Sequence, residues 1–133
     1  MKVCIIVANY YPKITNDLIL GASNKLKKNG IKNFKIIVVP GIFEIPYVIA
    51  KNINYYDDFI ALGCVIKGKT PHFDYISRAT INSISHLTIK HKKPIGNGII
   101  TCLNKKQAIE RSNHKKKDKG GEAANAIISI LRT

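Results

Sequence analysis

The hydrophobic residues of this chain fall into short continuous runs that alternate with longer amphipathic segments. Continuous apolar runs, typical of strands covered on both faces, occupy residues 2–7, 34–39, 57–65 and 95–102. Between them, helical patterns occupy 15–29, a segment that opens at 42–46 and runs to about 54, 71–90, a segment from 104, and the region after 121. Strands that alternate with helices predict an α/β fold of three layers, with a four-stranded parallel sheet in the middle.

Residues that favour helix ends mark the expected boundaries. Thr15 is placed to cap the first helix, and Gly30 suits the turn that ends it. Thr70 can cap the third helix with Pro71 at its first position, and Asn104 with Gln107 resembles a capping box for the fourth. The last helix is expected to bury Ala123, Ala124, Ile127, Ile128 and Leu131.

The predicted topology also places the ligand site. In a parallel sheet with helices on both faces, ligands bind beyond the carboxyl ends of the strands. Four segments are expected to meet there, namely residues 8–15, 40–44, 63–72 and 97–104. Functional side chains are therefore expected in these segments.

The net charge of the chain indicates which class of ligand it can bind. The 133 residues carry a formal net charge of +14, from 22 Lys and Arg against 8 Asp and Glu. The lysines lie in separate segments, such as 25–28, 90–93 and 115–117, so most of the charge is expected to be solvated surface. A small anionic substrate fits this balance. The sequence argues against nucleic acid as a partner, because no basic motif interleaved with aromatic residues is present.

The cysteines and the N-terminal pattern indicate the compartment. Cys4, Cys64 and Cys102 fall in expected strands and lack the close spacing of a metal site, which predicts buried thiols in a reducing compartment. No run is long enough to span a membrane, and no signal-peptide cleavage region follows the start. A cytoplasmic protein is expected.

The stretch 63–75 joins a buried strand to a helix through a short glycine loop. His72 follows Thr70 and Pro71, so it is expected in a first helical turn, beside unpaired backbone N–H groups that attract phosphate. A histidine beside an anion site can transfer protons near neutral pH. The same residues also fit a plain capped helix start, and taken alone they favour neither interpretation.

Other positions allow both a chemical and a structural interpretation. Phe43 and Glu44 can line a site for a polyhydroxyl ligand, although an acidic and an aromatic residue at a helix start are more often local stabilisers. Tyr10 and Tyr11 can stack on a planar ring, but spacing alone favours packing. Arg111 suits phosphate or carboxylate, and a solvated helix face is the simpler interpretation.

Taken in order, these segments resemble the 6,7-dimethyl-8-ribityllumazine synthase family. The matching blocks are IT at 14–15 with GA at 21–22, VPGIFEIP at 39–46, YD at 56–57, ALGCVIKGKTPHFDY at 61–75, QAIER at 107–111 and KGGEAA at 119–124. A match to one block alone is weak evidence for the family. The whole set in this order is specific for it and covers nearly the whole chain. The resemblance implies a single flavodoxin-like domain over 1–133.

The resemblance also implies a reaction in riboflavin biosynthesis. The family condenses 5-amino-6-(D-ribitylamino)uracil with 3,4-dihydroxy-2-butanone 4-phosphate to 6,7-dimethyl-8-ribityllumazine, releasing phosphate and water. No metal or redox cofactor is implied. Positioning, phosphate binding and proton transfer would carry the catalysis.

Site residues follow from the matched motifs. His72 resembles the proton-transfer histidine of the family. Lys69 and Thr70 would offer backbone N–H groups to the phosphate, with Arg111 as its charged partner. The residues implied to bind the pyrimidine and ribityl groups are Tyr10, Ile42, Phe43, Glu44, Cys64, Val65 and Ile66. A neighbouring subunit is implied to supply Asn97, Arg111 and Lys119.

The chain departs from the family pattern at several positions. Tyr11 stands where asparagine is common, Lys67 where arginine is usual, and Asp118 where asparagine is usual. Asn97 replaces a usual aromatic residue at the far wall of the ring pocket. The chain also begins late, without the leading segment that pairs with a neighbour's sheet in many members. A free homopentamer is therefore favoured over an icosahedral shell, and riboflavin synthase is a candidate partner.

Two other functions fit part of this pattern. The related archaeal-type riboflavin synthase shares the fold, but the blocks at 43–44 and 67–72 fit lumazine synthase better. A basic nucleic-acid-binding protein or a purely structural shell protein is the other alternative. It predicts RNA binding with a steep salt dependence.

Overall fold

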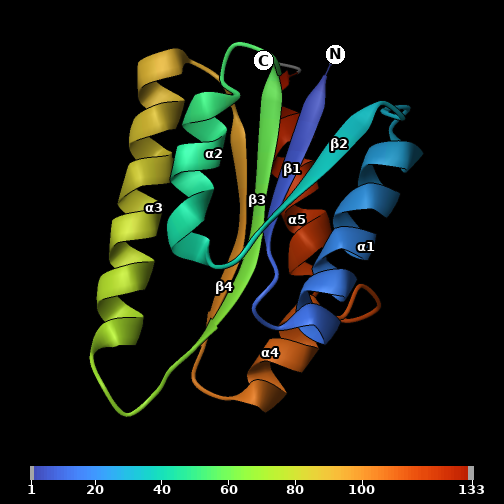
Figure 1. The fold of residues 1–133 in the computed structure, drawn as a ribbon. Coiled ribbons are helices and arrows are strands. Elements are labelled where there is room, and N and C mark those ends of the chain that lie inside the picture. Colours follow the sequence, from blue (N-terminus) through green and yellow to red (C-terminus); the bar gives the residue numbers. More distant parts are fainter. Residues whose placement is uncertain (1, 132–133) are drawn as a thin grey trace.

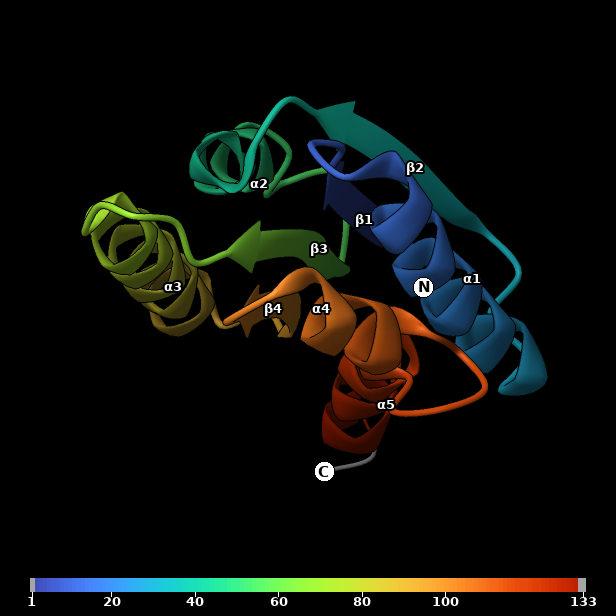
Figure 2. The same ribbon diagram turned by 90° about the horizontal axis from the view of Figure 1, so that it is seen from below.

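The computed structural model describes residues 2–131, which form a four-stranded parallel sheet between two layers of helices (Figures 1 and 2). The strands β1 (Val3–Ala8), β2 (Phe34–Val39), β3 (Asp58–Ile66) and β4 (Ile95–Cys102) lie in the order β2-β1-β3-β4. The expected three-layer α/β/α fold is confirmed. Of the domain expected over 1–133, residues 1, 132 and 133 lie outside the described part.

The helices divide between the two faces of the sheet. A short 3-10 helix (Ile42–Glu44), α2 (Ile45–Lys51) and α3 (His72–His91) lie on one face, as Figure 2 shows. The other face carries α1 (Pro12–Lys28), α4 (Lys105–Ser112) and α5 (Lys119–Leu131). No helix within residues 2–131 is long and apolar enough to cross a membrane.

β1 shows why the strands read as continuous apolar runs. Val3 and Ile5 belong to the core that includes the buried side chains of α1 and α5. Cys4 and Ile6 belong to the core on the opposite face, with the buried side chains of α2 and α3. Because side chains alternate between the two faces of a strand, a sheet covered on both sides requires apolar residues at every position.

Several expected boundaries are confirmed. β2 and β4 begin and end at the expected residues, and β1 and β3 are displaced by one. Asn104 Oδ1 accepts a hydrogen bond from Gln107 N at 2.9 Å, as a capping residue does. Gly30 follows α1 with a φ of +79°, a conformation that glycine adopts without strain.

The first helix begins earlier than expected. α1 starts at Pro12 and Tyr11 occupies the N-cap position, so the assignment of Thr15 as the cap is wrong. Thr15 is buried inside the first turns, where its Oγ1 donates to Tyr11 O at 3.1 Å. Proline is favoured at the first helical position, and at Pro12 this signal outweighed that of the threonine.

Three further details of the helices differ from expectation. α3 begins at His72 with Pro71 at the N-cap, so Thr70 is not the capping residue. The second helix is divided into the 3-10 turn and α2, and it ends at Lys51 rather than near residue 54. Leu131, expected on the buried side of α5, is the last residue of that helix and is 39% exposed.

Asp58, the first residue of β3, is a buried carboxyl group. Neither oxygen has a hydrogen-bond partner among the described residues. Burial raises the pKa of Asp58 from 3.8 to about 6, the neighbouring Asp57 adds to the rise, and Lys93 opposes it. Ionising Asp58 therefore costs more free energy in the folded protein than in the unfolded chain.

This carboxyl group predicts a loss of stability as the pH rises. Between about pH 4 and pH 6 the unfolded chain has released the Asp58 proton while the folded chain still holds it, so the free energy of unfolding falls across this window. We expect Asp58→Asn, which removes the charge and keeps the shape, to be more stable than the wild type at neutral pH by about 2 kcal/mol. Urea unfolding of both proteins at pH 4 and pH 7 measures the difference. A difference that does not grow with pH would contradict the prediction.

Candidate active site

A cavity of about 470 Å³ opens beyond the carboxyl ends of β1 and β3. Its walls come from the β1–α1 junction, the turn after β2, the last residues of β3 and the first turns of α3. Parallel pairing of the strands brings these distant segments to one edge of the sheet. The expected site residues that line the cavity are Tyr10, Ile42, Phe43, Glu44, Cys64, Val65, Ile66 and His72.

His72 is the first residue of α3 and lies exposed at the cavity rim. The loop before it is anchored to β4, because Lys67 N donates to Cys102 O at 2.9 Å. The first backbone N–H groups of an α-helix have no partner within the helix and carry its positive dipole end, which favours an anion. His72 therefore combines an imidazole with a place where an anionic ligand can bind.

Lys69 and Thr70 belong to the exposed loop between β3 and α3 and do not line the cavity themselves. Thr70 Oγ1 lies 3.4 Å from His72 N, which is long for a hydrogen bond. A Cβ added at Gly68 would meet no atom within 4 Å, so no other segment covers the loop there. This leaves the loop accessible to a ligand next to His72.

Glu44 has a structural role in its own turn. Its Oε1 accepts a hydrogen bond from Gly41 N at 2.9 Å and closes the turn after β2. Within the described residues, Oε2 has no partner. Phe43 beside it is 60% exposed. The structural and chemical interpretations of this pair are thus compatible, because one carboxylate oxygen holds the turn and the other is left for a ligand.

Tyr10 and Tyr11 form an aromatic pair at the start of α1. Their ring centroids lie 4.9 Å apart at an interplanar angle of 75°, which is an edge-to-face contact. Tyr10 is 72% exposed, so its ring remains available to a ligand. Tyr11 is half-buried and lines the cavity as well.

The thiols of Cys64 and Cys102 lie in contact between β3 and β4. Burial raises the pKa of Cys64 to about 12, and Cys102 adds to the rise. Burial also raises the pKa of Cys102, which the Arg111 guanidinium against it partly offsets. Both thiols therefore stay protonated at neutral pH and are poor nucleophiles. No group of three or more His, Cys, Asp or Glu side chains in residues 2–131 is placed to hold a metal ion.

Arg111, Lys119 and Asn97 do not line the cavity of their own chain. Arg111 Nη1 donates to Thr101 O at 2.9 Å. Lys119 Nζ pairs with Glu122 Oε2 at 2.8 Å at the start of α5. Asn97 is the third residue of β4 and lines a separate cavity of about 250 Å³ against α3. The expected segment 97–104 is therefore mostly strand, and only its last residues reach the carboxyl edge.

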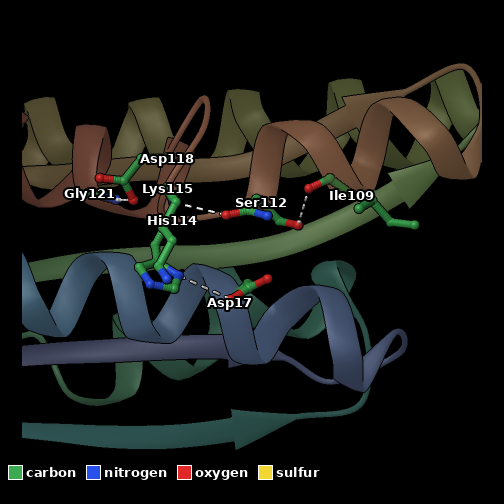
Figure 3. Close-up of polar contacts among 8 residues, drawn as sticks. Asp17, Ile109, Ser112, His114, Lys115, Asp118 and Gly121 are labelled. Carbon is green, nitrogen blue, oxygen red and sulfur yellow. Dashed lines mark hydrogen bonds and ion pairs between the residues drawn. The ribbon is translucent and has the colours of Figure 1, made fainter.

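The loop between Arg111 and Lys119 is attached to two helices (Figure 3). His114 Nδ1 lies 3.3 Å from Asp17 Oδ1 on α1. Asp118 Oδ1 accepts from Gly121 N at 3.1 Å and so holds the first turn of α5. These contacts fix the start of α5, and with it the place of Lys119.

Four residues line the cavity without having been expected to bind substrate: Ala8, Tyr11, Gly41 and Ile76. Ile76 stands four positions after His72 and so on the same helical face, which the helical periodicity indicated. Gly41 belongs to the turn block already recognised. Ala8 ends β1, and its position at the edge depended on the exact strand boundary. Tyr11 had been considered with Tyr10 for stacking on a planar ring, and packing had been favoured for both from spacing alone.

Comparison with known proteins points to a single family. The family model described as 6,7-dimethyl-8-ribityllumazine synthase matches residues 1–133. The chain is similar to proteins of that name from Cutibacterium acnes, at 38% identity over 98% of this chain and 80% of the relative, and from Desulfovibrio desulfuricans, at 38% over 99% and 87%. A relative of the same name from Campylobacter jejuni is 39% identical over 98% of this chain and 87% of its own length.

Proposed function

The chain belongs to the 6,7-dimethyl-8-ribityllumazine synthase family, and we propose that the cavity beyond β1 and β3 is where it carries out the reaction of that family. It is a transferase of riboflavin biosynthesis. It condenses 5-amino-6-(D-ribitylamino)uracil with 3,4-dihydroxy-2-butanone 4-phosphate to 6,7-dimethyl-8-ribityllumazine, with release of phosphate and water. The assignment of particular residues to this reaction is our proposal.

His72 is proposed to transfer protons in the condensation. The amine must lose protons as it adds to the ketone, and the departing oxygen atoms must gain them. His72 is the only histidine among the residues that line the described cavity, and it stands at the rim, where a proton can pass between ligand and solvent. This location, together with the aromatic side chains of the opposite walls, is the observation that carries the proposal.

The phosphate is proposed to bind next to His72. Lys69 and Thr70 contribute an exposed, uncovered loop whose backbone N–H groups can point toward an anion, and the amino end of α3 adds its positive dipole. Arg111 is the proposed charged partner, because a planar guanidinium binds two phosphate oxygens at once. Binding the phosphate here would place the adjoining ketone within reach of His72.

The pyrimidine substrate is proposed to occupy the remaining walls. Tyr10 presents an exposed ring for stacking, and Phe43 adds a second aromatic surface. Glu44 offers Oε2 to the ribityl hydroxyl groups. The last β3 residues, Cys64, Val65 and Ile66, are proposed to hold the edge of the ring through their backbone, with Ile42 as an apolar contact.

Asn97, Arg111 and Lys119 are proposed to act on the cavity of a neighbouring subunit in a homopentamer. None of the three lines the cavity of its own chain. The outer faces of α2 and α3 also carry exposed large side chains, with Tyr47 at 69% and Ile89 at 74%. Apolar surface of this kind is typical of a subunit interface. Riboflavin synthase remains a proposed partner, and the three buried free cysteines support a cytoplasmic, reducing location.

Sedimentation tests the assembly. Five chains of 14.8 kDa give a particle of about 74 kDa, which sedimentation velocity separates from both the monomer and a shell. We expect the pentamer at all working concentrations. A shell-sized particle would contradict the free pentamer, and a stable monomer with full activity would contradict the proposal that neighbouring subunits complete the site.

The function itself is tested by mixing the protein with both substrates and following the fluorescence of the lumazine product. We expect product well above the spontaneous rate of the mixture without protein. Lumazine alone is the second control, because a protein of the riboflavin synthase type would consume it. A rate equal to the spontaneous one would overturn the proposed function.

A further inference from the structure

The loop between α4 and α5, residues 113–118, lies along one face of α1. Near its beginning, His114 Nδ1 lies 3.3 Å from Asp17 Oδ1, and the two side chains point toward each other in Figure 3. At its end, the Asp118 carboxylate rests on the helix, because a Cβ added at Gly21 would lie 2.1 Å from Asp118 Oδ1. Asp17 and Gly21 are four residues apart and so share a helical face. The loop is therefore attached to α1 near both of its ends.

The contact between Asp17 and His114 joins two basic segments. The loop carries three consecutive exposed lysines at 115–117, and α1 carries four lysines with Asp17 as its one acidic residue. Lysines brought together in this way repel one another. The Asp17 carboxylate opposes this repulsion at the point where the loop meets the helix. The side chains of His114 and Asp17 are 26% and 37% exposed, so solvent screens the contact only in part.

The same loop separates the two cationic residues that are proposed to act on a neighbouring subunit. Arg111 lies in the last turn of α4, and Lys119 is the first residue of α5. The loop is closed on itself, because Asp118 N donates to Asn113 O at 3.0 Å and so ties its last residue to its first. A movement of the loop away from α1 would therefore displace the backbone at both Arg111 and Lys119.

We propose that Asp17 and His114 are a pair of positioning residues, which hold the loop on α1 so that Arg111 and Lys119 reach the phosphate substrate in the cavity of a neighbouring subunit. The proposal rests on the proposed function of this cavity and on its completion by a neighbour. Neither Asp17 nor His114 lines the cavity of its own chain, so the pair acts through the residues that it places. The contact with Thr101 O orients the Arg111 side chain, whereas the pair sets where the backbone that carries it lies.

Asp17→Ala and His114→Ala each remove the contact, and alanine does not weaken α1, because its helix propensity exceeds that of aspartate. We expect either substitution to raise the KM for the butanone phosphate about 3- to 10-fold, the range for the loss of one hydrogen bond. The KM for the pyrimidine substrate and kcat should change much less. The double variant should be no worse than either single variant, because both substitutions remove the same contact.

Asn16→Ala is the matched control, because Asn16 precedes Asp17 on α1 and its exposed side chain makes no hydrogen bond or ion pair within residues 2–131. It should leave both KM values as in the wild type. Unchanged KM values in both single variants, an equal rise of the two KM values, or additive effects in the double variant would each overturn the proposal. Sedimentation velocity of the variants gives a further test, since dissociation to monomers would show that the pair maintains the assembly instead. Failure of the proposed function would appear separately, as a wild-type protein without activity.

Discussion

His72→Asn is expected to lower kcat about 100-fold, because the variant keeps a polar side chain at the start of α3 and lacks a group that exchanges protons near neutral pH. General acid–base catalysis by one positioned side chain typically contributes about 10² to 10⁴ in rate, and the lower value is appropriate here because His72 is exposed at the rim. Initial rates of lumazine formation at saturating substrate, corrected for the spontaneous reaction, give kcat. The KM for the butanone phosphate should change less than kcat, since asparagine leaves the helix start and its N–H groups in place.

His91→Asn provides the matched control. His91 is the last residue of the same helix, so it lies about 28 Å from His72 at a rise of 1.5 Å per residue, near the opposite edge of the sheet. The substitution is chemically identical and should leave kcat unchanged. If His72→Asn retained wild-type kcat while His91→Asn did too, proton transfer would have to be assigned to another group of the cavity, and the central part of the proposed mechanism would fail.

Gly120→Ala is expected to destabilise the fold by about 3 kcal/mol, the upper end of the usual range for overpacking. A Cβ at this position would lie 2.1 Å from Leu18 O and 2.9 Å from Leu18 Cα. These are backbone atoms in the middle of α1, which cannot rotate away as the end of a side chain can. Helix propensity alone predicts the opposite sign, because alanine in a helix is favoured over glycine by about 1 kcal/mol. The sign of the change therefore decides whether the close packing of α1 on α5 dominates.

Gly68→Ala is the control for this prediction. A Cβ there meets nothing within 4 Å, and the position has no positive φ. The change should be neutral or slightly stabilising, by at most about 1 kcal/mol, because alanine restricts the unfolded chain. Urea unfolding of the two variants beside the wild type measures both effects. A Gly120→Ala variant as stable as Gly68→Ala would show that α1 and α5 can move apart freely.

Local patterns were sufficient for the architecture. The continuous apolar runs identified the strands to within one residue, since a sheet covered on both faces needs apolar side chains at each position. Asn104 was recognised as a cap because its partner Gln107 lies three residues away in the same turn. Alternation of strands and helices then left few topologies, and the parallel order placed the site at the carboxyl edge.

Two expected capping residues were wrong. Thr15 lies inside α1, which begins at Pro12, and Thr70 precedes Pro71, which is the N-cap of α3. At α1 the side chain of Thr15 turns to the carbonyl of the preceding turn, a competing hydrogen bond that sequence alone does not rank. Propensity favours a type of element at a position, whereas the exact first residue depends on small differences between competing caps.

By itself, the sequence determined the α/β class, the parallel sheet, most of the strand limits and the family, because each depends on residues close together in the chain or on motifs in a fixed order. Only the tertiary structure decided which side chains share the cavity, that Asn97 lies in a separate cavity, and that a Cβ at Gly120 would meet the backbone of Leu18. These facts arise from the packing of segments far apart in the sequence. Their distances are set by the helix and strand layers as a whole, and no local pattern records them.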